Sequence, residues 1–321
     1  MSRAVDSRFF VVVGAGMAGL LAANMLRNHY TIVIEAQPRL PNNHSAVLRF
    51  RSSVVGDALG IPFKKVRALK GISPWKHPVA DAMAYSYKAT GQATMRSIIS
   101  ANAEPVERYI APKNLIAKME ASLTNPVVYS KPLTASLLDK FKGEGACVIS
   151  TIPMPALMSI LDPEMSRTRP AFPARPGQNI VTKLNDVDAY LSVYIPDPGY
   201  HFHRVSITGD ELIIEYAKTM DFSDSGKIAN QVRKALQFVG LPEHVADMRT
   251  IDVRSQTYAK ILPIDDAARK KFITWATDTH GVYSLGRFAC WRPGLLLDDV
   301  VEDVRKIERM IDHGNYDLKV K

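Results

Sequence analysis

The sequence predicts an α/β fold, in which a Rossmann-like dinucleotide-binding domain is assembled from discontinuous segments and carries an inserted antiparallel-sheet substrate domain. Three observations predict it. A buried apolar strand at residues 9–13 leads into a glycine motif, a helix and a second strand. Another buried strand, ACVIST, follows at residues 146–151. Between residues 190 and 216, apolar and polar side chains alternate in three runs, which is typical of antiparallel strands.

The order of these segments divides the chain into two predicted domains. We expect residues 1–40, 104–165 and 262–321 to form the nucleotide-binding domain, and residues 41–103 and 166–261 the substrate or cap domain. The pattern changes near Arg167, where Pro170, Pro173 and Pro176 predict a crossover.

The glycine motif Gly14-Ala-Gly16-Met-Ala-Gly19 has the spacing that holds a dinucleotide pyrophosphate. Gly14 permits the tight turn from strand to helix, Gly16 lets the backbone approach the phosphates, and Gly19 lets the helix pack closely on the strand. The helix N-terminus directs free N–H groups at the same place. Glu35 ends the second strand, where its carboxylate can accept hydrogen bonds from both ribose hydroxyls.

The surroundings of the motif favour dinucleotide binding over the alternative, a glycine-rich turn that only packs a helix. A strand precedes the motif, a helix follows it, and an acid ends the second strand. The spacing alone does not distinguish FAD from NAD.

Composition bounds the partners and the location. The 321 residues are 46% hydrophobic, which allows a large core, and the formal net charge is +9. Such a basic excess favours acidic partners such as nucleotides, nucleic acid or phosphorylated metabolites; the alternative is a basic protein with no such partner. We expect a cytoplasmic protein without a membrane span, and free thiols at Cys147 and Cys290.

Three stretches carry a resemblance to a known superfamily. They are VVVGAGMAGLLAANML with TIVIEAQPRL, then ACVISTIPMPALMSIL, then GVYSLGRFACWRPGLLLDDVVEDVRKI. In this order they resemble the flavin-containing amine oxidase and UDP-galactopyranose mutase superfamily. The stretch YIPDPGYHFHRVSI also resembles a strand pair of the mutase-like branch. The resemblance implies noncovalent FAD, because no His or Cys stands in a flavin-attachment motif.

The resemblance also implies which residues hold the FAD: Gly14, Ala15, Gly16, Met17, Ala18, Gly19, Glu35, Ala36, Arg39, Thr151, Gly286, Arg287, Leu297 and Asp298. Arg39 is expected near the pyrophosphate, and Gly286 and Arg287 beside the diphosphate or the isoalloxazine. The alternatives are a surface salt bridge for Arg287 and an ordinary acid of a first helical turn for Asp298.

The sequence departs from the superfamily after the ribose acid. The Gly-Gly pair that these families carry there is missing, and residues 38–44 read PRLPNNH. His44 is the only candidate for the histidine of the mutase substrate loop, and its context does not match.

Basic residues supply the candidate substrate site. Arg49 and Arg51 are expected on one face of a strand, where two guanidinium groups suit a phosphate or carboxylate; the alternative is a solvated strand face. Arg204 follows His201 and His203, which share a predicted strand face at metal-ligand spacing. No third ligand is evident, so no metal site is expected.

Two aromatic residues are candidates for contact with the reacting groups. Tyr258 lies in a stretch that resembles the return from the substrate domain, and Trp291 follows the C-terminal flavin motif. Simple packing is the alternative for Trp291.

Three functions fit these features. The first is FAD-dependent oxidation of a C–N bond in an amine or amino-acid-type substrate. In size, charge and layout the chain is similar to bacteriophage flavoenzymes that modify thymine in DNA, for which the substrate is glycyl-modified thymidine, the product 5-aminomethyl-deoxyuridine and the location the host cytoplasm. The second is a redox-neutral flavin-dependent mutase acting on a sugar nucleotide. The third is a flavin-fold protein that binds nucleic acid structurally.

Overall fold

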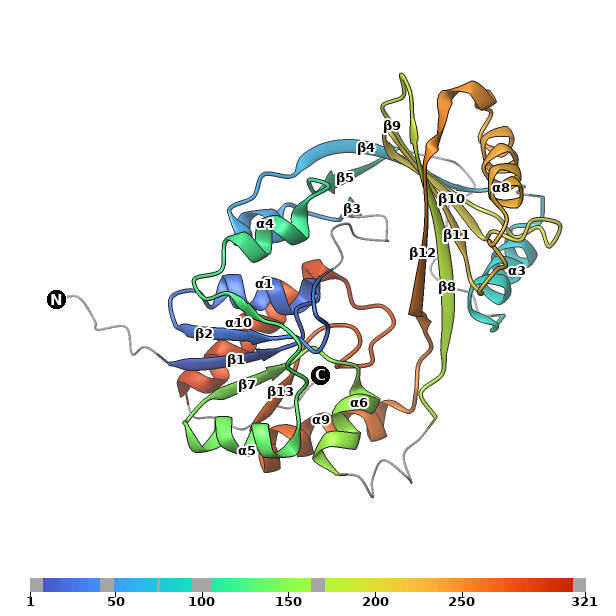
Figure 1. Ribbon diagram of the computed structural model, residues 1–321. Coiled ribbons are helices and arrows are strands. Elements are labelled where there is room, and N and C mark those ends of the chain that lie inside the picture. Colours follow the sequence, from blue (N-terminus) through green and yellow to red (C-terminus); the bar gives the residue numbers. More distant parts are fainter. Residues whose placement is uncertain (1–7, 41–48, 74–75, 94–104, 163–170, 314–321) are drawn as a thin grey trace.

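A computed structural model describes residues 8–40, 49–73, 76–93, 105–162 and 171–313 of the chain. Two sheets stand side by side, and Figure 1 shows the parallel sheet with helices on both faces and the second, longer sheet beside it. Among the described residues, no helix combines the length and the hydrophobicity that a membrane span requires.

The parallel sheet has five strands in the order β13-β7-β1-β2-β6. Their bounds are β1 Phe9–Val13, β2 Tyr30–Ile34, β6 Val127–Val128, β7 Cys147–Ser150 and β13 Val282–Ser284. All four neighbouring pairs run parallel. The carboxyl ends of β1, β2 and β7 therefore meet at one edge, where the loops that follow them can build a site.

Side chains of β1 alternate between two cores, which explains its continuous apolar sequence. Phe10 and Val12 pack with helices α1 (Met17–Met25), α4 (Leu115–Ala121) and α10 (Leu297–His313). Val11 and Val13 pack with α5 (Ala135–Gly143), α6 (Met154–Leu161) and α9 (Asp266–His280) on the opposite face. Because both faces of the strand are buried, neither allows a polar residue.

The second sheet has eight strands in the order β12-β8-β11-β10-β9-β4-β5-β3. Their bounds are β3 Arg49–Phe50, β4 Lys64–Ile72, β5 Val106–Ile110, β8 Ala174–Leu184, β9 Ala189–Tyr194, β10 Arg204–Gly209, β11 Glu211–Tyr216 and β12 Ala246–Ile261. Every pair is antiparallel except β4 with β9.

The two faces of this sheet differ in chemistry. Helix α8 (Ser225–Phe238) covers the apolar face, where its Val232 and Leu236 pack with Val205 and Ile214. We call the opposite side the polar face; it carries Ser192, Arg204, Thr208 and Glu215, which are register partners or alternate positions of β9, β10 and β11. In Figure 1 α8 lies on the side away from the parallel sheet, so the polar face is turned toward it.

Three further helical segments connect the strands of the second sheet. They are α2 (Val54–Leu59), α3 (Pro78–Thr90) and the 3-10 turn Glu243–Val245. Helix α2 packs against α1 and α10, so it belongs to the layer over the parallel sheet.

The predicted fold class is confirmed, including the antiparallel strands between residues 189 and 216. The sequence pattern did not predict β4, the long strands β8 and β12, or helix α9. Strand β8 begins inside the predicted proline crossover. Its first residues, Ala-Arg-Pro-Gly, pair with the last residues of β12, where the register between the two strands shifts. Strand β5 lies inside a range expected for the nucleotide-binding domain, yet it pairs with β3 and β4. The domain limits themselves remain a prediction.

Candidate cofactor and substrate site

Two of the three motif glycines are required by the protein's own packing. Gly14 has φ +96°, and a Cβ there would lie 2.6 Å from Oγ1 of Thr151. A Cβ on Gly19 would lie 1.9 Å from the carbonyl oxygen of Gly14. Any side chain at these positions would push the first turn of α1 away from β1.

Gly16 differs, because a Cβ built on it meets no atom within 4 Å. Its backbone is ordinary, with φ −65° and ψ 175°, so the fold does not require glycine there. Gly16 is the N-cap of α1, no side chain caps the helix, and its first turn contains no acid. Open space before free helical N–H groups and the positive end of the helix dipole fits a pyrophosphate.

Glu35 is held at the edge of this space. Its Oε2 accepts a hydrogen bond from the backbone N–H of Ala15 at 2.7 Å, and its Oε1 accepts one from the N–H of Gln37 at 2.9 Å. The carboxylate is therefore fixed next to the glycine loop at the carboxyl end of β2, as ribose binding requires. Ala36 and Arg39 follow on the exposed surface.

Thr151 and Gly286 hold the loop from two sides. The Thr151 hydroxyl donates to the carbonyls of Val13 at 2.9 Å and Gly14 at 3.1 Å. Gly286 has φ +88°, and a Cβ there would lie 2.8 Å from Cβ of Ala18, so the chain after β13 passes over the first turn of α1. Segments more than 130 residues apart in sequence thus meet at one loop. Arg287 donates to the carbonyl of Pro293 and so braces the same segment.

Asp298, at the start of α10, binds the loop that follows β3. Its Oδ1 accepts hydrogen bonds from the backbone N–H groups of Arg51 at 3.2 Å and Ser52 at 3.1 Å. Asp299 caps the helix instead, since its Oδ2 accepts from the N–H of Leu296 at 2.8 Å. Asp298 is therefore more than an ordinary acid of a first turn, and Leu297 is the first residue of the helix.

Arg49 and Arg51 are not the two-arginine strand face that the sequence predicted. Strand β3 ends at Phe50, and Arg51 lies exposed in the loop that follows. The Arg49 guanidinium donates to Ser192 Oγ at 3.0 Å, to Thr208 Oγ1 at 2.9 Å and to the Leu191 carbonyl at 2.7 Å. Because most of its donors are used on β9 and β10, Arg49 braces the polar face.

Arg204 forms a buried ion pair with Glu215, its register partner on the next strand. The Arg204 guanidinium also lies over the Tyr194 ring, 5.7 Å from its centroid. Burial by itself would raise the pKa of Glu215, but the charge of Arg204 outweighs it and lowers that pKa to about 2. The charge of Arg204 on the polar face is therefore compensated by Glu215.

The two aromatic candidates lie together under the parallel sheet. The Trp291 side chain is 1% exposed and donates from Nε1 to the Leu262 carbonyl at 3.0 Å. The half-buried Tyr258 ring packs against it edge to face, 6.0 Å between centroids. This placement fits the packing interpretation of Trp291.

The histidine candidates separate. His44 lies outside the described residues. His201 and His203 precede β10 and do not share a strand face: His201 is exposed, whereas His203 is 2% exposed. The described part of the chain contains no group of three potential metal ligands.

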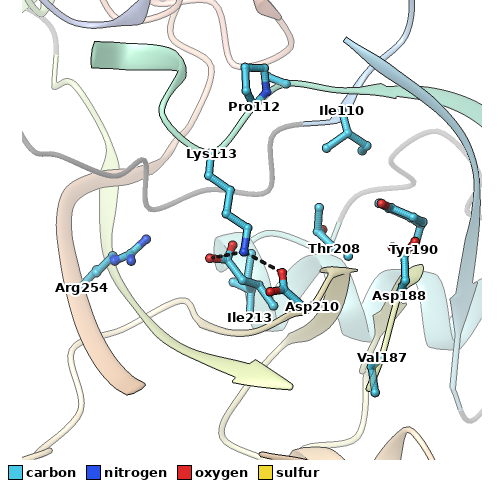
Figure 2. Close-up of a pocket in the computed structure, with 13 residues that line it drawn as sticks. Ile110, Pro112, Lys113, Val187, Asp188, Tyr190, Thr208, Asp210, Ile213 and Arg254 are labelled. Atoms are coloured by element: carbon cyan, nitrogen blue, oxygen red, sulfur yellow. Dashed lines mark hydrogen bonds and ion pairs between the residues drawn. The ribbon is translucent and has the colours of Figure 1, made fainter. Parts of the chain in front are cut away.

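A cavity of about 340 Å³ opens between the loop at residues 110–113 and the turn that joins β10 to β11. In Figure 2 the Lys113 side chain reaches across it, and its Nζ lies 2.6 Å from Asp210 Oδ1 and 3.4 Å from Glu211 Oε1. The sequence does not predict this grouping, because only the fold brings Lys113 to a turn 97 residues further along the chain.

Comparisons with known proteins identify the fold. No protein-family model and no curated protein matches the sequence. Among solved structures, reduced UDP-galactopyranose mutase matches with a TM-score of 0.68 at 12% identity, over 96% of this chain and 94% of that one. The chain shares the fold of UDP-galactopyranose mutase.

Two further structures agree with this result. The CLA-producing fatty acid isomerase from P. acnes has a TM-score of 0.59 at 12% identity, over 97% of this chain and 99% of that one. A double mutant of putrescine oxidase has a TM-score of 0.56 at 11% identity, over 95% and 99%. The mutase fold thus extends over nearly the whole of this chain, although few residues are shared.

Proposed function

We propose that this protein binds FAD noncovalently and oxidises a C–N bond of an amine or amino-acid-type substrate to an imine, which water hydrolyses. A bound FAD would supply a two-electron acceptor that oxygen regenerates with release of hydrogen peroxide. The basic polar face favours a nucleotide-type substrate. The proposed location is the cytoplasm, where nucleotides and replicating DNA occur.

The observation that carries the proposal is the open space at Gly16. A glycine that the fold does not require stands at an uncapped helix N-terminus, with the Glu35 carboxylate fixed beside it. The N–H groups of α1 would hold the pyrophosphate, and Glu35 would exchange its bond from Ala15 for the ribose hydroxyls. The resemblance to flavin-containing amine oxidases and mutases supports FAD as the dinucleotide.

The favoured substrate is glycyl-modified thymidine, as a free nucleotide or in DNA, with 5-aminomethyl-deoxyuridine as product. The phosphate of the nucleotide or of the strand suits the net charge of +9, and the glycyl nitrogen supplies the C–N bond. The protein's part in the reaction is to position the glycyl carbon and exclude other groups, since proton transfer is a small requirement in this chemistry.

The second candidate is a redox-neutral mutase that acts on a sugar nucleotide. The TM-score of 0.68 to UDP-galactopyranose mutase favours it. The missing match to the mutase histidine loop around His44 opposes it.

The test begins with the colour of the purified protein. We expect a yellow protein whose flavin absorbance is released by mild denaturation, and a colourless one after Gly16→Asp, because the new carboxylate would repel the pyrophosphate. A wild-type protein that stays colourless after incubation with FAD would overturn the proposal.

Activity then separates the candidates. An oligonucleotide with glycyl-modified thymidine should bleach the flavin without air, and admission of air should restore the colour with formation of peroxide; the unmodified oligonucleotide is the control. A mutase would need prior chemical reduction and would consume no oxygen. A structural DNA-binding protein would retain its DNA affinity after Gly16→Asp and oxidise nothing.

A further inference from the structure

Lys70 lies on the polar face of the second sheet. It belongs to the half of β4 that pairs with β9, and its register partner is Ser192. Ser192 accepts a hydrogen bond from Arg49, so Lys70 and Arg49 are on the same side of the sheet. Arg108 shares this side, because its register partner Val66 and Lys70 are alternate positions of β4.

Positive charge accumulates here with little compensation. Four guanidinium groups lie close enough to Lys70 to interact with it electrostatically: those of Arg49, Arg51, Arg108 and Arg204. The nearby Glu215 carboxylate is already paired with Arg204. In the part of the chain that the structure describes, no carboxylate forms an ion pair with Lys70 or Arg108. Both side chains are half-buried, so neither is fully solvated.

The crowding has an energetic effect on Lys70. Burial lowers its pKa to about 8, and the charges of Arg108, Arg49, Arg204 and Arg51 act in the same direction. Gathering like charges in a partly desolvated place is unfavourable unless an anion offsets them. A phosphate, with more charge and more acceptor oxygens than a carboxylate, offsets more of this repulsion.

We propose that Lys70 and Arg108 bind a phosphate group of the substrate, while Arg49 holds the strands beneath them in place. This site rests on the proposed function in one respect only, which is that the ligand is taken to be the substrate. Arg108 can offer two parallel N–H donors to the phosphate and Lys70 a compact charge. A free nucleotide and a nucleic acid strand both carry this group, and the experiment below distinguishes them.

The experiment measures the affinity of the purified protein for two probes by titration calorimetry, without turnover. The probes are thymidine monophosphate and a short oligothymidylate. Lys70→Met should weaken binding about tenfold at pH 7, since one charge-assisted contact is lost, and Lys70→Arg should restore most of the affinity. Lys65→Met is the matched control, because Lys65 lies in the same strand on the opposite face and pairs with Glu107.

The pH dependence provides a second readout. The phosphodiester groups of oligothymidylate keep their charge between pH 7 and 9. The charged groups that face Lys70 are Arg49, Arg51, Arg108 and Arg204, and Glu215 is paired with Arg204. Lys70 is charged below its pKa of about 8 and neutral above it, so wild-type affinity should fall from pH 7 to pH 9. The Lys70→Arg variant should show no such fall.

The outcomes are distinct from those of the proposed function. Lys70-dependent binding of both probes identifies a site for a free nucleotide, and binding of oligothymidylate alone identifies a site for a strand. Equal affinity of Lys70→Met and wild type, an equal loss in Lys65→Met, or no binding of either probe would overturn the site. Flavin content and C–N oxidation are measured separately, so their failure would overturn only the proposed reaction.

Discussion

At the residue scale, one amino-acid type has different roles within a single motif. Gly14 and Gly19 are glycine because a Cβ would collide with Thr151 or with the backbone of Gly14 itself. Gly16 is glycine although the fold leaves its side-chain direction open. The open space beside Gly16 supports the proposal that a ligand lies there.

The first prediction compares two alanine substitutions. Gly19→Ala should lower the melting temperature by several degrees, because the helix must move from a contact of 1.9 Å. Gly16→Ala should melt like wild type but bind FAD at least about tenfold more weakly, because its methyl group occupies the place of the phosphates. Calorimetric melting and FAD titration check both. Loss of stability in Gly16→Ala, with unchanged FAD affinity, would contradict this division of roles.

At the element scale, β10 and β11 are connected by charge as well as by backbone hydrogen bonds. Arg204 and Glu215 pair near the end of the hairpin that lies away from its turn, and Glu215 is 6% exposed. A pair at this depth destabilises the protein when only one partner is removed, because the other charge stays buried.

The second prediction follows from this pair. Glu215→Gln should lower the free energy of unfolding by about 3 kcal/mol at pH 7, measured by urea denaturation. The folded pKa of Glu215, about 2, lies below its ordinary 4.5, so its contribution is complete above pH 4.5 and is lost as the pH falls toward 2. The variant should lack that part of the acid loss of stability.

Glu211→Gln is the control for this prediction. Glu211 lies in the same strand and on the same face, and it pairs with Lys113 at 3.4 Å with 30% of its side chain exposed. Such a pair contributes at most about 1 kcal/mol. Equal effects of the two substitutions would show that burial of the Arg204 pair is not what stabilises the hairpin.

At the scale of the whole molecule, two sheets of opposite character face each other. The parallel sheet is apolar on both sides and has the glycine loop at one edge. The second sheet turns its polar face toward the parallel sheet, since α8 covers the other face (Figure 1). A cofactor held by the first would therefore lie near substrate held by the second, which is the arrangement that a hydride-transferring enzyme needs.

The third prediction concerns this basic character. Affinity for oligothymidylate should fall about sevenfold between 50 and 200 mM salt if two phosphates are contacted, because bound counterions are released. Fluorescence anisotropy over that range measures the slope, and an uncharged sugar or nucleoside serves as the comparison. An affinity that does not change with salt would exclude phosphate contacts as its source.

The candidate cofactor loop could be predicted from the sequence more completely than the candidate substrate site. The glycines, Glu35, Thr151 and Gly286 lie at one loop because strand order and short-range turns fix them. Arg49 and Arg51 were expected to share a face, but β3 ends between them. Alternation predicts a face only while a strand continues, and a strand of two residues leaves no periodicity to detect.

The sequence by itself determined the glycine loop, its acid, and the change from parallel to antiparallel strands, since these depend on backbone geometry and on the period of nearby side chains. Only the tertiary structure decided which charges meet. Lys70 and Arg108 come from neighbouring strands, Arg204 and Glu215 from others, and their mutual distances depend on strand register across an eight-stranded sheet. Electrostatic energy depends on distance in space, which sequence separation does not determine.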